Sequence, residues 1–100
     1  DKKAMSEFFR VLKKGGWAIL LVPIIGEKTF EDFSITDPEE RTRLFGQSDH
    51  VRNYGLDYID RLKSVGFKVE IFYPESIFTS EELEHMAVNK AAGEIYYCTK

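Results

Sequence analysis

The sequence predicts a small α/β fold in which helices flank a sheet, and three observations lead to this class. The segment from Trp17 to Val22 is apolar at every position, which is typical of a strand covered on both faces. The expected order of elements is helix, strand, two helices, strand, short helix and strand, a layered α/β arrangement. The connection between the first two strands is long enough for parallel pairing. A chain of 100 residues is expected to form one domain, residues 1–100.

The first helix is predicted to begin near Asp1, which can cap it. Its apolar side chains recur at spacings of three and four and so share one face: Ala4, Met5, Phe8, Phe9 and Leu12. Gly15 and Gly16 end this helix. Pro23 ends the strand that follows, because proline has no backbone N–H to donate.

A second helix is predicted after Asp37. Asp37 is the expected N-cap, Pro38 suits the first helical position, and Glu40 can complete a capping box. The segments on either side of this helix, residues 24–35 and 47–55, mix polar and aromatic residues without a clear period. Both are therefore predicted to be loops.

The remaining elements are a helix, a strand, a short helix and a strand. The third helix ends at Gly66 and has one apolar face: Leu56, Ile59, Leu62 and Val65. Residues 67–71 alternate between apolar and charged side chains, which predicts a strand with one less buried face. Residues 80–88 are predicted to form the short helix, and residues 94–99 the last strand.

Composition and charge argue against several classes of function. The formal net charge of −3 argues against a nucleic-acid partner, because such proteins usually carry a basic stripe. The longest apolar run, Trp17–Ile25, is much shorter than the roughly 20 residues that span a bilayer, so no membrane partner is expected. Cys98 is the single cysteine, which suits a reducing cytoplasm. His50 and His85 share no helix face, so no metal site is expected.

The segment RVLKKGGWAILLVP, residues 10–23, resembles a signature of the class I S-adenosylmethionine-dependent methyltransferases, in particular their type 11 small-molecule branch. That family carries an R-x-L-K-P-G-G turn before its fifth strand, and Lys14 stands here in place of the proline. The resemblance covers nearly the whole chain and is most specific in the FGQxDHVRxYG motif. It continues through TFED (29–32), TDPEERTRLFGQSDHVRNYG (36–55), DYIDRLKSVGFKVE (57–70) and IYYCTK (95–100).

The resemblance implies the C-terminal half of a Rossmann-like methyltransferase sheet. Its three strands would lie in the order first, third, second, with the last strand antiparallel: Trp17–Val22, Glu94–Thr99, Phe67–Phe72. The family binds S-adenosylmethionine in its N-terminal half, on a glycine-rich turn and an acidic residue that this chain does not contain. No cofactor is therefore expected to bind the chain alone. The edge Trp17–Val22 would lack its neighbouring strand, which predicts a homo-oligomer formed through that edge.

Two residues are candidates for a catalytic role. His50 can serve as a general base that assists methyl acceptance, or it is a loop histidine bonded to a neighbouring backbone group or to solvent. Tyr54 can line an acceptor pocket, or it is a packing residue at the entry to a helix.

Three further residues are candidates for binding the substrate. Arg52 can clamp an acidic group, or it forms an ion pair with Asp49 or Asp57. Asp49 either faces the substrate or orients the loop. Pro23 follows a strand at the end where α/β folds bind ligands, although it also simply ends that strand.

The leading functional hypothesis is the C-terminal segment of a methyltransferase that supplies the methyl-acceptor side of the active site, with a small molecule as acceptor. On its own the segment is expected to be inactive. The alternative is a non-catalytic, methyltransferase-like interaction module that binds a partner chain or associates with itself. The carboxylates Glu31 and Asp32 of the TFED segment can bind a cation, or they belong to a solvated acidic loop.

Overall fold

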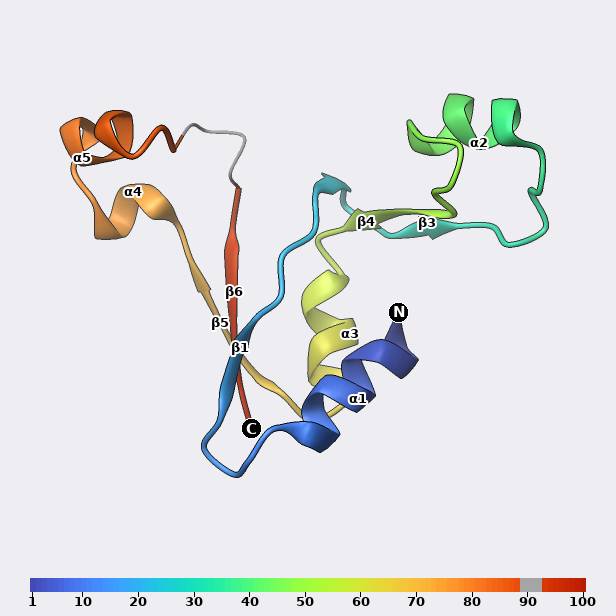
Figure 1. Ribbon diagram of the computed structural model, residues 1–100. Coiled ribbons are helices and arrows are strands. Elements are labelled where there is room, and N and C mark those ends of the chain that lie inside the picture. Colours follow the sequence, from blue (N-terminus) through green and yellow to red (C-terminus); the bar gives the residue numbers. More distant parts are fainter. Residues whose placement is uncertain (89–92) are drawn as a thin grey trace. The chain divides into compact units, whose positions relative to one another are not determined.

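The computed structural model describes residues 1–88 and 93–100. The chain divides into two compact units, residues 1–21 with 59–100 and residues 22–58. The first unit contains most of α3 (Tyr58–Ser64) and six further elements (Figure 1): α1 (Lys2–Val11), β1 (Trp17–Ile19), β5 (Lys68–Phe72), α4 (Pro74–Ile77), α5 (Ser80–His85) and β6 (Ile95–Thr99). The second contains β2 (Ile24–Gly26), β3 (Phe30–Glu31), α2 (Pro38–Phe45) and β4 (Arg52–Gly55). The predicted α/β class is confirmed, and no helix among the described residues has the length and apolar character needed to cross a membrane.

The sheet of the first unit has the strand order β1-β6-β5. β6 is antiparallel to both neighbours, and Thr99 lies opposite Trp17 on one side and Lys68 on the other. The predicted order and the antiparallel last strand are therefore confirmed. β1 is shorter than expected, ending at Ile19, although the N–H of Leu20 still donates to the carbonyl of Tyr96 at 3.2 Å.

The core of the first unit lies on one face of this sheet, which α1 and α3 cover (Figure 1). Tyr96 and Cys98 point to this face from β6, and Leu62 of α3 is completely buried. Phe9 of α1 meets Phe67 edge to face, with ring centroids 5.1 Å apart. The predicted apolar faces are therefore buried only in part: Met5 and Leu62 lie in the core, whereas Phe8 is exposed and Leu56 precedes α3 and is exposed.

The opposite face of the sheet is apolar and exposed. Trp17, Ile19 and Leu21 are 57%, 48% and 55% exposed. The register places Ala18 opposite the buried Cys98, so Trp17 and Ile19 point away from the core. The prediction that Trp17–Val22 is covered on both faces is therefore wrong, because the helices of this unit pack against one face only.

The helices α4 and α5 both begin at residues that favour the start of a helix, Pro74 in α4 and the N-cap Thr79 in α5. α5 has a complete capping box, in which the Thr79 hydroxyl accepts from the Glu82 N–H and the Glu82 carboxylate accepts from the Thr79 N–H. These hydrogen bonds hold the pKa of Glu82 below its ordinary value. The helix ends at His85, three residues earlier than predicted. The sequence prediction missed α4, which begins at Pro74, a residue that suits the first turn of a helix.

Raising the pH above 9 is expected to destabilise the first unit through the Cys98 thiol. Burial raises the pKa of Cys98 from 9.0 to about 11. The unfolded chain therefore loses this proton at a pH where the folded chain keeps it, so the free energy of unfolding falls between these two values. Urea midpoints measured at about pH 8 and about pH 10.5 should drop more in the wild type than in Cys98→Ala. Equal drops in the two proteins would show that the thiol contributes nothing.

The second unit is built on a small sheet with the order β2-β4-β3. β4 is parallel to β2 and antiparallel to β3. Residues 24–35 and 47–55 are therefore not entirely loops, as the sequence predicts. These strands are only two to four residues long, which is too short for a hydrophobic period to be visible.

The helix α2 forms as predicted beside this sheet. The Asp37 carboxylate accepts from the Glu40 N–H at 2.8 Å, and Pro38 is the first helical residue. Gly46 ends the helix with a φ of 85°, a conformation that favours glycine. Phe45, the last residue of α2, is buried and stacks on Phe30 of β3, with ring centroids 5.6 Å apart.

Candidate functional site

A cavity of about 490 Å³ lies within the second unit, and all five site residues predicted from the sequence line it. They come from two places in the chain: Pro23 precedes β2, and the others belong to the segment that leads into and forms β4, namely Asp49, His50, Arg52 and Tyr54. The parallel pairing of β2 with β4 places Ile24 opposite Tyr54. A volume of this size falls in the range of small-molecule sites.

The wall of the cavity is largely apolar. Its apolar and aromatic members are Val22, Pro23, Ile25, Phe45, Val51 and Tyr54, and its polar members include Gln47, Asp49, His50 and Asn53. Asn53 is fixed by α2, because its side-chain amide donates to the carbonyl of Leu44 at 3.0 Å. The site therefore combines an apolar surface with a few placed polar groups, as ligand pockets commonly do.

The turn that carries Asp49 and His50 follows directly from the end of α2. The backbone N–H of His50 donates to the carbonyl of Gln47 at 3.2 Å, which closes this turn. His50 is half-buried and Asp49 is exposed. The imidazole can take up a proton from a bound molecule, and the carboxylate can attract a positive charge.

Arg52 forms an ion pair, as one of the two sequence interpretations holds, but with a different partner. Its Nε lies 2.5 Å from Oε2 of Glu31, and the side chains are 12% and 31% exposed. Glu31 and Arg52 face each other directly in the β3–β4 pair. The sequence does not predict Glu31 as the partner, because the register of β3 against β4 is not visible in the sequence.

The Arg52 guanidinium also lies against two aromatic rings. Its Cζ lies 5.5 Å from the ring centroid of Phe33 and 5.3 Å from that of Tyr54. Its Nη1 donates to the Tyr54 hydroxyl at 3.2 Å. Arg52 is thus engaged by a carboxylate, a hydroxyl and two aromatic faces.

Tyr54 lines the cavity and also packs against a neighbouring aromatic side chain. Its ring lines the cavity and also packs against the buried Tyr58 at an interplanar angle of 67°, with centroids 4.9 Å apart. Its hydroxyl is held by Arg52. This arrangement fixes the orientation of the Tyr54 ring relative to the cavity.

A close backbone crossing holds β4 in place. A Cβ atom at Gly55 would lie 2.3 Å from the carbonyl carbon of Lys28. The Thr29 hydroxyl accepts from the Gly55 N–H, and the Asp57 carboxylate accepts from both the N–H and the hydroxyl of Thr29, each at 2.7 Å. The N–H of Leu56 donates to the carbonyl of Gly26 at 2.9 Å. These hydrogen bonds and the close backbone approach hold the segment between β2 and β3 against β4.

Glu31, Phe33 and Asn53 contribute to the site in ways that the sequence does not predict. Glu31 was expected in a solvated acidic loop or a cation site, whereas it pairs with Arg52. Its neighbour Asp32 accepts from the N–H and the hydroxyl of Ser34, which lowers the pKa of Asp32. The opposite charges of Glu31 and Arg52 were the available signal, but their pairing requires knowledge of the strand register.

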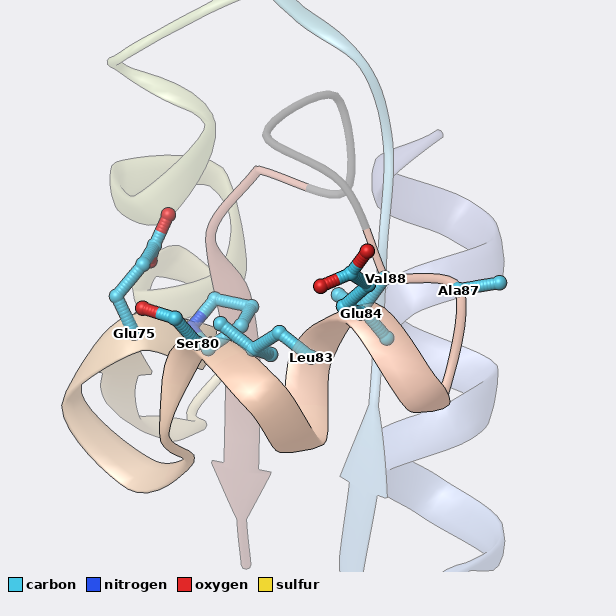
Figure 2. A pocket seen from close by; sticks show the side chains of 7 residues that line it. Glu75, Ser80, Leu83, Glu84, Ala87 and Val88 are labelled. Carbon is cyan, nitrogen blue, oxygen red and sulfur yellow. The ribbon is translucent and has the colours of Figure 1, made fainter.

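A second cavity, of about 510 Å³, lies along α4 and α5 in the first unit. Figure 2 shows the carboxylate side chains Glu75 and Glu84 separated along the helices, with Ser80 and Leu83 between them. None of the predicted site residues belongs to this cavity. Within residues 1–88 and 93–100, no three His, Cys, Asp or Glu side chains gather as a metal ion would require.

Comparison of the chain with family models, with curated proteins and with solved structures found no match.

Proposed function

We propose that the chain is the C-terminal segment of an S-adenosylmethionine-dependent methyltransferase and supplies the methyl-acceptor side of its active site. The observation that carries this proposal is the meeting of Pro23 with the residues of the FGQxDHVRxYG motif around one cavity. The strand order β1-β6-β5, with β6 antiparallel, supports it further, because the resemblance implies this order.

The residues of this chain do not themselves fit the cofactor. The prediction that Gly15 and Gly16 end the first helix is wrong, because α1 ends at Val11 with Leu12 as its C-cap and the two glycines lie in the turn that follows. Their N–H groups donate to backbone carbonyls, that of Gly15 to Lys100 at 3.0 Å and that of Gly16 to Lys13 at 2.8 Å, and this turn precedes a strand rather than the helix N-terminus that holds an anionic ligand. The chain's contribution is therefore confined to the acceptor.

The chain's own chemical role is to hold the acceptor and to manage its proton. The apolar wall and the fixed ring of Tyr54 orient the molecule, which is the larger part of catalysis in a transfer between two bound partners. His50 takes up the proton that the acceptor releases.

The reading frame immediately upstream of Asp1 provides a first test. We expect it to continue into a glycine-rich turn that follows a strand, with an acidic residue after the next strand. A stop codon directly before a start codon near Asp1 would contradict the proposal and favour the interaction module.

The interaction module is the second candidate because of the apolar side chains exposed along β1. Trp17 and Ile19 belong to an edge strand of the described sheet, and Leu21 continues their row. An exposed apolar edge of this kind pairs readily with a second copy. In this function the chain associates through the Trp17–Val22 edge and carries out no chemistry.

Self-association is expected to depend on Ile19. Light scattering at tens of micromolar should give the mass of at least two chains for the wild type, and Ile19→Lys should return the mass of one chain because a charge on this row opposes edge pairing. Val11→Lys is the matched control, since Val11 is an exposed apolar residue of α1 outside the row. A wild-type mass of one chain would contradict association through this edge.

A further inference from the structure

We infer that the cavity of the second unit binds a small organic cation, a protonated amine on an aromatic or apolar body. That this molecule is the methyl acceptor rests on the proposed function, whereas its binding does not. Three features lead to this class of ligand: the state of Arg52, the charge around the cavity, and the nature of its wall.

Arg52 is the only cationic side chain of fixed charge that lines the cavity in the described part of the chain. Its Nε lies 2.5 Å from the Glu31 carboxylate, and its guanidinium lies against the rings of Phe33 and Tyr54. An acidic ligand would have to compete with Glu31 for the guanidinium of a side chain that is only 12% exposed. The predicted role of Arg52 as a clamp for an acidic group is therefore disfavoured by the geometry.

Arg52 and Glu31 offset each other's charge, so the charge that remains around the cavity is negative. Asp49 is the remaining charged residue of the lining, and it is exposed at the cavity. Residues 22–58 hold eight acidic and four basic side chains. This unit thus carries more negative charge than the chain as a whole, whose net charge is −3. A negative field of this kind attracts cations and repels carboxylates.

The wall of the cavity suits an aromatic body. The side chains of Phe45, Tyr54 and Ile25 offer flat and apolar surface, while Gln47 and Asn53 offer polar atoms that can bond a hydroxyl. The volume of about 490 Å³ accommodates a single-ring compound with a short side chain. A phenol with an ethylamine arm fits these three features together.

The test uses the whole chain and three probes of the same shape that differ in charge: tyramine (cation), tyrosol (neutral) and 4-hydroxyphenylacetate (anion). Binding is followed by the NMR shifts of the His50 ring and the Tyr54 amide. We expect tyramine to bind about tenfold more tightly than 4-hydroxyphenylacetate, with tyrosol between them. Equal or tighter binding of 4-hydroxyphenylacetate would overturn the inference, as would the absence of shifts with all three probes.

Two variants test whether residues at the cavity set the preference for a cationic probe. Asp49→Asn should weaken tyramine binding about fivefold and leave tyrosol unchanged, and Glu31→Gln should strengthen 4-hydroxyphenylacetate binding about fivefold because it releases the charge of Arg52. Glu39→Gln is the matched control, an exposed acidic residue of α2 that does not line the cavity. If Glu39→Gln changes tyramine binding as much as Asp49→Asn does, the preference is not set at the cavity.

The outcome is separable from that of the proposed function, because no cofactor and no upstream segment enter the assay. A methyltransferase that acts on an acidic acceptor would fail this test and still transfer a methyl group. A chain that prefers tyramine but belongs to no methyltransferase would pass it.

Discussion

Replacing Gly55 with alanine is expected to unfold the second unit or to cost about 3 kcal/mol or more of its stability. The added Cβ would lie 2.3 Å from the carbonyl carbon of Lys28 and 2.5 Å from both its Cα and its N. All three atoms are backbone, so no side-chain rotation can relieve the overlap. β4 or the segment between β2 and β3 would have to move, and the hydrogen bond from the Gly55 N–H to Thr29 would be lost with it.

Gly26→Ala is the matched control for this prediction. A Cβ at Gly26 would meet the carbonyl oxygen of Lys28 at 3.9 Å, an ordinary contact. Urea unfolding followed by tyrosine fluorescence should therefore show a large loss for Gly55→Ala and a change within about 1 kcal/mol for Gly26→Ala. Similar midpoints for the two variants would contradict the close crossing of Gly55 and Lys28.

Replacing Leu62 with alanine should remove about 2–5 kcal/mol from the stability of the first unit. Leu62 is 0% exposed and lies in α3 beneath the sheet. The substitution loses the transfer free energy of the removed methyl groups and leaves a cavity in the core. For a domain of this size such a loss corresponds to a drop in Tm of about 10 °C or more.

Leu56→Ala serves as the control, because it deletes the same atoms from a leucine that is more than half exposed. We expect its effect on Tm to be small. Comparable drops in Tm for Leu62→Ala and Leu56→Ala, measured by circular dichroism, would contradict the placement of the core on the α1 and α3 face of the sheet.

The first unit was largely predictable because its order comes from long, periodic segments. The spacing of apolar residues in α1 and the alternation in β5 are visible in the sequence, and both elements formed as expected. The exposure of Trp17 and Ile19 differs from the sequence prediction. A continuous apolar strand indicates that both faces are suited to burial, but not that helices of the same chain cover both.

In the second unit only the helix α2 was predictable; the five candidate site residues line one cavity, and their roles stay predictions. α2 carries its own start signal at Asp37 and Pro38, whereas β3 and β4 depend on a strand register that local sequence does not encode. The pairing of Arg52 with Glu31 follows from that register. The candidate residues themselves came from a resemblance to a family motif, so their spacing alone did not select them.

The most direct test of the central proposal is calorimetric titration of S-adenosylmethionine into the chain joined to the segment encoded upstream of Asp1. The proposed function predicts saturable binding with a Kd in roughly the micromolar range for the joined protein, and none for the 100-residue chain alone. A joined protein that unfolds cooperatively but does not bind S-adenosylmethionine would contradict the assignment of this chain to a methyltransferase.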